Sequence, residues 1–546
     1  MNTLYYGDNI TIMHEKMGKD AVDLIYLDPP FKSDENYNLL YKKLTGKPVP
    51  EQIVAFTDTW TLDDAKEQVA RTMPVLMREH GVPDYYVDFW RLWMNALRHT
   101  NKELLAYLIY MVQRLLYMKT ILRPTGSIYL HCDPAASHYI KVMMDAIFGH
   151  ENFRNEIAWK RAGSHGSSKR WEPVHDTILF YTKTDKYTWN KIVQPYEAGY
   201  IEMKYRCKDV RGLFQDVSLT GVGVRRGDSG KPWRGHNPTE KGRHWAIPTA
   251  LGAEMLGFKD MSTQEKLEAL DAADLLYWPR GGDGFPRLKQ YPGKGVPIQD
   301  VITDISAINS QAEERLGYPT QKPKALIDRI IQASSNQGDI VFDPFCGCGT
   351  TIYSAIANDR QWKGCDIAIL PIRLVAAQLA SRCRLVQGVH FEIDGVPVSV
   401  EQAEHLFRRD PFQFQHWLVE RVGGFPMMKK VADKGIDGRM YFETREGLKE
   451  VLLSVKGGNL RPSDVRDLHG VLERERAAIA GFLSLKEPSK SMREEAARAG
   501  SYLYQGISYP RLQLLTVQEI LEGKRDLHTP TKVSTKIVTG QGALAL

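Results

Sequence analysis

The sequence predicts an α/β protein with a parallel, doubly wound sheet, because strand-like and helix-like patterns alternate in two separate parts of the chain. In the first part we expect a helix at 137–148 and buried strands at 22–27, 127–130, 156–159 and 176–181. In the second part we expect helices at 324–333 and 350–357 and strands at 339–342 and 362–365. Such alternation favours parallel strands that are joined by helices.

The chain is too long for a single core, and its composition and periodicity change along its length. With 546 residues it is expected to form two or three domains. Between about 184 and 309, Gly, Pro, Trp and Arg become frequent and long periodic segments disappear. After about residue 384 a separate segment begins, with strands and helices of its own, and the last residues are expected to form a loosely held tail.

The composition is that of an ordinary globular protein, with 43% hydrophobic and 25% charged residues. The first twenty residues lack the pattern of a signal peptide, and no run of about 18 apolar residues predicts a membrane span, so we expect a cytoplasmic protein. Cys346 and Cys348 lack the second pair or histidine partner that a zinc site needs. A net charge of +6 is compatible with a nucleic-acid partner without demanding one.

A glycine-bearing turn at 343–349 is a candidate cofactor site. It follows a strand and precedes a helix, and Gly347 and Gly349 would allow a ligand to approach the backbone closely. Asp343 at the strand end would repel a pyrophosphate but suits an amine or a cation. Asp366, at the end of the next strand, could accept the hydroxyls of a ribose. The motif fits an adenosine that carries an amino-acid tail, although it also fits an ordinary strand-to-helix turn.

A second motif, Asp28-Pro29-Pro30-Phe31, follows the first predicted strand. An exocyclic base amine is a poor nucleophile, so its methylation needs acceptors that bind the amine in the transition state. The Asp28 carboxylate and the Pro29 carbonyl could serve, and Phe31 could stack on a base flipped out of the duplex. By itself this motif could equally be a plain turn.

In combination, the two motifs resemble the β-class DNA amino-methyltransferases, in which the catalytic motif comes first, the target-recognition region follows and the cofactor motif is last. Further matching segments are Tyr5–Asn9, Gly126–Asp133, Asn155–Trp159 and Tyr318–Pro323. The resemblance covers about residues 1–384. It implies a Rossmann-like, S-adenosylmethionine-dependent methyltransferase fold with circularly permuted motif order, divided into a catalytic half (1–184), a target-recognition region (185–310) and a cofactor-binding half (311–384).

The resemblance also assigns residues and a substrate. It places Asp28, Pro29, Pro30 and Phe31 at the catalytic centre, and at the cofactor Asp8, Thr320, Gln321, Lys322, Asp343, Phe345, Gly347, Gly349 and Asp366. Many family members have Glu at the position of Asp366. An Asp before Pro-Pro goes with adenine more often than with cytosine, so it implies a site-specific adenine-N6 methyltransferase of a bacterial or phage restriction–modification system. Cytosine-N4 methylation is the main chemical alternative.

Basic residues in two segments are candidates for contact with double-stranded DNA. Lys160, Arg161, Lys169 and Arg170 bracket a Ser/Gly-rich loop, and further along stand Arg225, Arg226 and Arg234, which are interleaved with Trp233 and Trp245. We expect the cations to bind phosphates and the tryptophans to pack against bases or sugars. The alternative is a solvated basic surface.

The segment from 385 to 546 resembles the PD-(D/E)xK nuclease core, which is an α/β restriction-endonuclease-like domain. Asp437 and Lys456 match its acid and its lysine, and Glu420 could supply a further acid, which implies Mg²⁺ binding and DNA cleavage. Ser454 stands where an acid or Gln is expected, so an inactive DNA-binding domain is an equal alternative.

Three rival readings of the whole chain remain open. It could be a non-catalytic DNA-binding protein that kept the fold, or a methyltransferase acting on RNA or on a small molecule. A homodimer is also compatible with the sequence.

Overall fold

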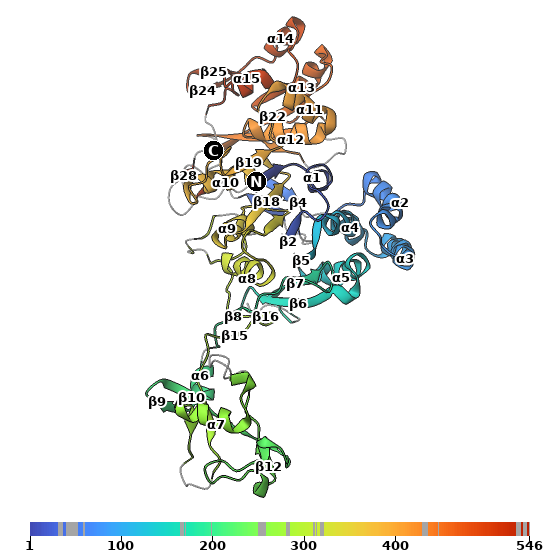
Figure 1. Ribbon diagram of the computed structural model, residues 1–546. Coiled ribbons are helices and arrows are strands. Elements are labelled where there is room, and N and C mark those ends of the chain that lie inside the picture. Colours follow the sequence, from blue (N-terminus) through green and yellow to red (C-terminus); the bar gives the residue numbers. More distant parts are fainter. Residues whose placement is uncertain are drawn as a thin grey trace. The chain divides into compact units, whose positions relative to one another are not determined.

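The computed structural model describes residues 1–30, 36–39, 53–57, 60–163, 169, 171–197, 199–248, 258–279, 284–309, 312, 314–316, 321–427, 435–445, 447–530, 537–538 and 543–544. The chain divides into two compact units (Figure 1). The first comprises residues 1–190 and 300–546, and the second comprises residues 191–299.

A nine-stranded sheet among the described residues is the centre of the first unit. Its strand order is β16 (Val301–Ile302), β6 (Phe153–Lys160), β7 (His175–Thr182), β5 (Leu122–Cys132), β2 (Val22–Leu27), β17 (Ile340–Asp343), β18 (Gln361–Asp366), β1 (Asn2–Tyr6) and β19 (Phe391–Asp394). The pairings are parallel except for the two that β7 makes, which are antiparallel. The expectation of a parallel sheet is therefore wrong for β7, because β6 is followed directly by β7 with no described helix between them to carry the chain back, and the two strands pair as antiparallel neighbours.

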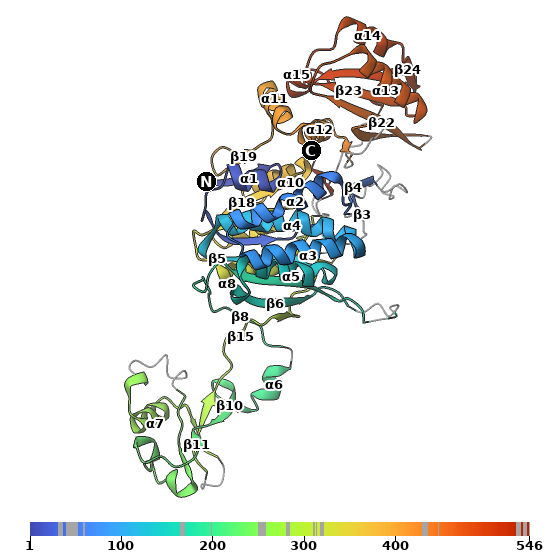
Figure 2. The ribbon, with the colours of Figure 1, turned by 90° about the vertical axis from the view of Figure 1, so that its right-hand side faces the viewer.

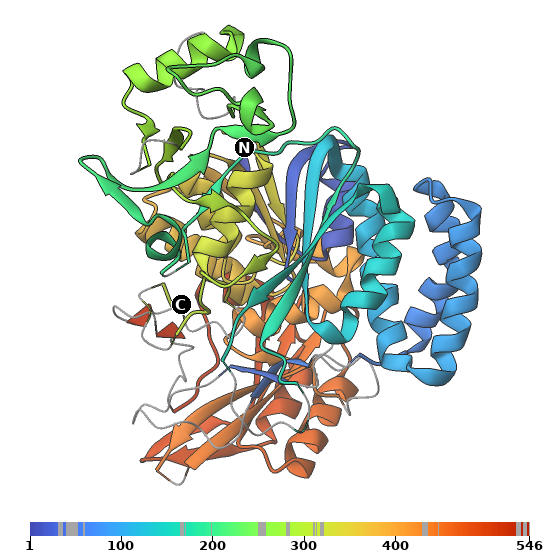
Figure 3. The ribbon, with the colours of Figure 1, turned by 90° about the horizontal axis from the view of Figure 1, so that it is seen from below.

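Helices cover both faces of this sheet, as a doubly wound fold requires (Figure 3). Leu24 and Tyr26 of β2 belong to a core with α8 (Lys324–Ser334), α9 (Thr350–Ala357) and α10 (Ile369–Ser381). Ile25 and Leu27 alternate to the other core, which includes α1 (Asn9–Glu15), α4 (Lys102–Ile121) and α5 (Pro134–Phe148). The alternation follows from the two-residue period of a strand.

Three consecutive helices, which the sequence pattern did not predict, form a layer on the second face. Helices α2 (Asp64–Glu79) and α3 (Asp84–Thr100) pack on α4 (Figure 2). Because α4 lies between the sheet and these two helices, it is apolar nearly all round and shows no one-sided stripe for sequence reading to detect.

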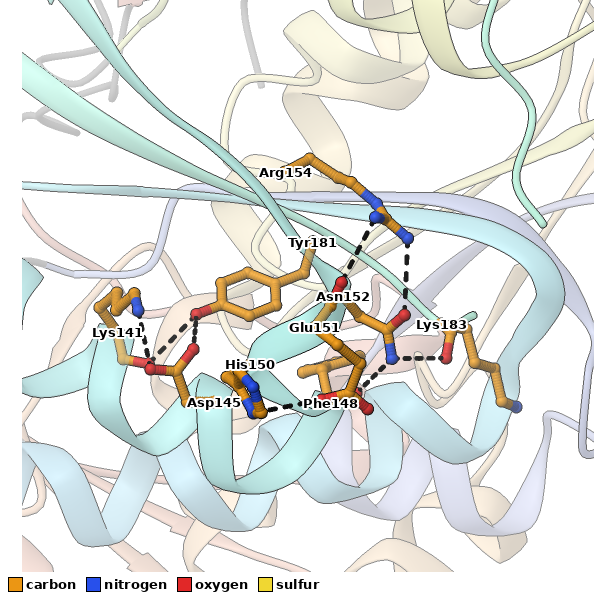
Figure 4. A network of polar contacts seen from close by, with 9 residues as sticks. All are labelled: Lys141, Asp145, Phe148, His150, Glu151, Asn152, Arg154, Tyr181 and Lys183. Carbon is orange, nitrogen blue, oxygen red and sulfur yellow. Dashed lines mark hydrogen bonds and ion pairs between the residues drawn. The ribbon is translucent and has the colours of Figure 1, made fainter. Parts of the chain in front are cut away.

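A polar network fixes the end of α5 against the β6–β7 pair (Figure 4). The Tyr181 hydroxyl donates to Asp145 Oδ1 at 2.7 Å, and Lys141 Nζ lies 2.7 Å from Asp145 Oδ2. Asn152, the last residue of the 3₁₀ turn η1 (His150–Asn152), donates through Nδ2 to the Phe148 carbonyl at 2.8 Å. These bonds hold the two strands that flank the predicted DNA-contacting loop.

The second unit is built from short strands around its own apolar cluster. A four-stranded sheet has the order β13 (Leu276–Tyr277), β14 (Arg287–Gln290), β10 (Gly212–Ser218) and β9 (Cys207–Asp209). Two further pairs are β8 (Val193–Gln194) with β15 (Val296–Pro297) and β11 (Thr220–Val222) with β12 (Arg243–Trp245). The helices are α6 (Tyr200–Lys204) and α7 (Thr263–Ala272), with the 3₁₀ turns η2 (Asp228–Gly230), η3 (Thr239–Lys241) and η5 (Phe258–Asp260). Trp233 and Trp245 are only 4% and 2% exposed. The expectation that they pack against DNA is therefore wrong, because they form the core of this unit.

The chain beyond residue 384 begins inside the central sheet, since β19 pairs with β1. Helices α11 (Val400–Arg409) and α12 (Pro411–Arg421) follow. A five-stranded sheet then has the order β20 (Phe425–Pro426), β21 (Gly438–Thr444), β22 (Gly447–Lys456), β23 (Ile479–Ser484) and β26 (Leu512–Thr516), with α13 (Pro462–Arg474), α14 (Lys490–Ala497), α15 (Val517–Leu521) and the hairpin of β24 (Ser501–Tyr504) and β25 (Ile507–Pro510) around it.

Two further short pairs are β3 (Asn36–Leu39) with β4 (Ile53–Thr57), and β27 (Ile537–Val538) with β28 (Ala543–Leu544). In the part of the chain that the structure describes, no helix is long and apolar enough to cross a membrane.

Candidate active site

The carboxyl ends of four neighbouring parallel strands bring the predicted acidic residues to one edge of the central sheet. Asp28 follows β2, Asp343 ends β17, Asp366 ends β18 and Asp8 lies just after β1. Strand ends at this edge are where open α/β sheets bind ligands. The topology thus unites residues from the two ends of the methyltransferase-like region.

The turn after β17 has the backbone that the sequence predicts. Gly347 and Gly349 have positive φ angles of 45° and 85°. A Cβ atom on Gly349 would lie 2.7 Å from Val375 Cγ2, so the turn also needs the space that glycine leaves. The Gly347 N–H donates to Asp366 Oδ2 at 3.0 Å, and the Phe345 N–H donates to Asp343 Oδ1 at 3.0 Å. The two carboxylates therefore organise the turn from both sides.

The carboxyl groups of Asp343 and Asp366 are buried, which favours a cationic ligand. Burial raises the pKa of Asp343 to about 7, although hydrogen bonds from Thr351 and Phe345 oppose this rise. Burial likewise raises the pKa of Asp366 to about 6. A buried carboxylate without a cation nearby is costly, and a positively charged ligand offsets that cost. This donor set fits S-adenosylmethionine, which carries an ammonium and a sulfonium group.

We expect the affinity for S-adenosylmethionine to rise with pH up to about pH 7, because only the ionised form of Asp343 attracts the ligand's cation. One linked proton changes the affinity by at most about tenfold per pH unit, which amounts to up to about thirtyfold between pH 5.5 and 7. In Asp343→Asn the affinity should be weak at both pH values and its pH dependence smaller. Titration calorimetry at the two pH values measures this, and an equally steep dependence in the variant would contradict the role of Asp343.

The same raised pKa gives a stability effect of known sign. Without ligand, folded Asp343 holds its proton up to about pH 7, whereas the unfolded chain releases it near the ordinary value of 3.8. The free energy of unfolding contributed by this group therefore falls as the pH rises from about 4 to about 7.

Asp8 and Asn9 connect the end of β1 to the glycine turn. Asp8 caps α1 by accepting the Ile10 N–H at 2.8 Å, and its second oxygen lies 2.5 Å from Arg114 Nη2. Asn9 Nδ2 donates to the Pro344 carbonyl at 2.9 Å. The position predicted to lie near the cofactor adenine is therefore joined to the predicted cofactor turn.

The catalytic motif contains an ion pair that the sequence analysis did not predict. Lys322 Nζ lies 2.5 Å from Asp28 Oδ2, and the two side chains are only 10% and 15% exposed. Lys322 comes from the segment predicted to close over the methionine end of the cofactor. Its neighbour Gln321 bonds the backbone of Glu314 and Leu316. Pro29 is buried and Pro30 partly so, whereas Phe31 and Thr320 lie outside the described residues.

A buried row of polar side chains next to Asp28 was also missed. The Tyr26 hydroxyl lies 2.9 Å from His131 Nδ1, and His131 Nε2 lies 3.2 Å from Asp176 Oδ2. Arg161 Nε completes the row at 2.9 Å from Asp176 Oδ1. Burial lowers the pKa of His131, and the nearby Lys322 cation lowers it further, so this imidazole is neutral near pH 7. The signal in the sequence was the segment Gly126–Asp133, which matched the family but suggested no role for its histidine.

The predicted DNA-contacting residues fall into two groups. Lys160, Lys169, Arg225 and Arg226 are exposed. Two others are engaged within the protein: Arg161 with Asp176, and Arg234 with the carboxylates of Glu268 and Asp271. Arg170 lies outside the described residues.

The nuclease-like motif is occupied by bonds within the protein. Asp437 Oδ2 accepts the Val455 N–H at 2.6 Å and lies 3.2 Å from the Ser454 hydroxyl. Glu420 Oε2 instead accepts the Ile369 N–H, at the start of α10, at 3.0 Å. Lys456 is the last residue of β22. No group of three or more His, Cys, Asp or Glu side chains in the described ranges could hold a metal ion.

Comparison with known families gives two matches. The model of a DNA methylase family, the N6/N4 methyltransferases, matches residues 22–374. The model of a NACHT-associated inactive restriction endonuclease matches residues 411–522.

Two relatives agree with the first match. M.EcaI, a type II methyltransferase of Enterobacter cloacae, is 34% identical over 278 residues, which are 50% of this chain and 58% of M.EcaI. The Mod subunit of the type III enzyme StyLTI of Salmonella typhimurium is 25% identical, over 66% of this chain and 51% of the subunit. The chain thus spans little more than half the length of these relatives.

Among solved structures, the cytosine-N4-specific PvuII DNA methyltransferase covers 70% of this chain and 88% of its own, with 10% identity and a TM-score of 0.34. The M1.HpyAVI complex with S-adenosylmethionine covers 69% and 100%, with 14% identity and a TM-score of 0.28. Family membership follows from the family model, which spans residues 22–374 and includes Asp28 and the glycine turn. The chain belongs to the N6/N4 family of DNA methylases.

Proposed function

We propose that this protein transfers a methyl group from S-adenosylmethionine to the N6 amine of adenine at a specific site in double-stranded DNA. The observation that carries the proposal is the Asp28–Lys322 pair at the end of β2, one strand away from the Asp343 turn at the end of β17. The pair places a buried carboxylate beside a turn whose glycines and acids suit the cofactor. The exposed cations Arg225, Arg226, Lys160 and Lys169 are proposed to hold DNA phosphates.

In the proposed reaction the base amine is itself the nucleophile, so the chain has to bind this amine and does not have to supply a nucleophile of its own. When bound, S-adenosylmethionine supplies an electrophilic methyl group. Lys322 occupies Oδ2 of Asp28, and no described residue donates to Oδ1. That oxygen can accept a hydrogen bond from the base amine and stabilise the tetrahedral nitrogen that forms as the amine attacks. The Pro29 carbonyl is the second proposed acceptor.

Adenine is favoured over cytosine by the Asp that precedes the two prolines. One relative that matches a shorter segment is the DNA adenine methyltransferase YhdJ of Escherichia coli, 48% identical over 66 residues, which are 12% of this chain and 22% of YhdJ.

The test is to express the chain in a host free of DNA methylation and to sequence the host's DNA with detection of modified bases. N6-methyladenine at one recurring sequence is expected. N4-methylcytosine would overturn the adenine proposal, and unmodified DNA would overturn both.

We further propose that the nuclease-like segment, residues 385–546, binds DNA without cutting it, as an inactive nuclease-like domain of a cytoplasmic restriction–modification protein would. The Val455 N–H and the Ser454 hydroxyl already engage Asp437 Oδ2. Purified protein is therefore expected to leave methylated and unmethylated plasmid intact with Mg²⁺ or Mn²⁺. Metal-dependent cutting that Lys456→Ala removes would contradict this proposal and would support the nuclease alternative.

A further inference from the structure

Helix α12, with which the match to an inactive restriction endonuclease begins, packs on the methyltransferase core. Phe414 and Trp417 of α12 belong to the same buried apolar cluster as Ile369 and Ile372 of α10. The two helices also contact each other directly. The nuclease-like segment is therefore seated on the helix that follows β18, the strand that ends at Asp366.

Glu420 on α12 supplies a cap that α10 lacks in its own sequence. The residue just before α10 is Ala368, whose side chain makes no capping hydrogen bond. Such a cap normally comes from the residue that precedes a helix. Here Glu420 Oε2 accepts the N–H of Ile369, the first residue of α10, at 3.0 Å, although the two residues are 51 positions apart in the chain. The first turn of α10 therefore depends on where α12 lies.

The backbone that Glu420 holds continues into the predicted ribose site. Asp366 Oδ1 accepts the Ala368 N–H at 3.0 Å, and Asp366 Oδ2 accepts the Gly347 N–H at 3.0 Å. Glu420 and Asp366 thus bind the adjacent N–H groups of Ile369 and Ala368. An aspartate side chain has only two torsion angles, so its carboxylate follows its own backbone closely. A shift of this backbone would move the Asp366 carboxylate relative to the glycine turn.

We propose that Glu420 is a positioning residue for the cofactor site: by capping α10 it sets the place of Asp366, and through Asp366 the affinity for S-adenosylmethionine. The inference rests on the proposed function and deepens it, because it gives the nuclease-like segment a role in methylation. Glu420 then serves the methyltransferase and not a metal ion. Since coupling between two sites is reciprocal, cofactor binding should in turn hold α12 more firmly.

The first test compares Glu420→Leu with Glu420→Gln in the full-length protein. Burial of the carboxyl group raises the pKa of Glu420 to about 8, although the Ile369 N–H and the Arg373 cation oppose the rise, so this group is largely neutral near pH 7. Glutamine keeps a neutral acceptor at this position, whereas leucine leaves the Ile369 N–H without its partner. Calorimetry should show about fivefold weaker binding of S-adenosylmethionine in Glu420→Leu and nearly wild-type binding in Glu420→Gln. The KM for the cofactor should follow the same pattern, while kcat at saturating cofactor stays near wild type.

The matched control is Glu404→Leu on α11, because Glu404 pairs with the exposed Arg408 of the same helix. This variant should bind the cofactor as the wild type does. Wild-type affinity in Glu420→Leu, or equal losses in Glu420→Leu and Glu420→Gln, would overturn the inference alone. If the wild-type protein bound no S-adenosylmethionine, the proposed function itself would fail.

Hydrogen exchange of the wild-type protein tests the coupling without a variant, which matters because the loss of a helix cap also destabilises a fold. Saturating S-adenosylmethionine should slow amide exchange at the start of α10 and in α12 by up to about fivefold, the same factor as in the affinity test. Exchange in α14, which packs on α13 and β26, should not change. Protection that stops at α10 and does not reach α12 would show that α12 is not coupled to the cofactor, and would overturn the inference.

Discussion

Replacing Asp28 by alanine is expected to lower the rate of methyl transfer by about two orders of magnitude or more, with affinity for S-adenosylmethionine close to wild type. The carboxylate is proposed to contact the base amine as it becomes tetrahedral, and removing one such preorganised group costs about 10²–10³ in kcat in comparable sites. The cofactor is proposed to be held by other residues, at the ends of β17 and β18. The measurement is single-turnover incorporation of labelled methyl groups into DNA, together with calorimetry.

A surface variant controls for nonspecific effects on folding. Asp88 on α3 is 66% exposed and pairs only with Arg91 in the described structure. Asp88→Ala should retain wild-type turnover, because exposed ion pairs contribute little to stability. If Asp28→Ala turned over DNA as fast as this control, the catalytic assignment would be wrong.

Much of the fold could be predicted from short patterns in the sequence. The strand before Asp28 and the strand–turn–helix around Gly347 lie where apolar runs and glycines predict them, since these signals act over a few residues. The structure places helix α9 at Thr350–Ala357, the range predicted from its spacing. Strand direction is a different matter. The antiparallel course of β7 depends on which strand it joins, and no pattern within its eight residues records that choice.

The contacts that shape the candidate site were harder to predict, because they join distant parts of the chain. Lys322 is 294 residues from Asp28, and its expected role concerned the cofactor. The prediction of DNA contacts for the basic, tryptophan-rich stretch of the second unit was partly wrong for a related reason. Without periodicity, nothing in the sequence distinguishes an exposed tryptophan from Trp233, which is buried, or a free arginine from Arg234, which two carboxylates neutralise.

Replacing Lys322 by methionine is expected to lower kcat by tenfold to about a hundredfold at pH 7 and to destabilise the fold. Both members of the pair are nearly buried, and removing one partner of a buried ion pair costs about 3–5 kcal/mol because the other charge is left uncompensated. Without Lys322, the Asp28 side chain also loses the contact that holds Oδ2 in place, so it is positioned less well to accept a hydrogen bond from the base amine. The volume of the side chain is nearly kept, so the change tests the charge.

A variant that keeps the charge distinguishes this effect from simple misfolding. Lys322→Arg should retain part of the activity, since it keeps the charge. The matched control is Lys324→Met, two residues away, whose partner Asp328 is one helical turn along α8 and whose own side chain is 39% exposed. It should change kcat little. Equal losses of kcat in Lys322→Met and Lys322→Arg would show that the charge of Lys322 does not matter for catalysis, and the effect would then be on folding alone.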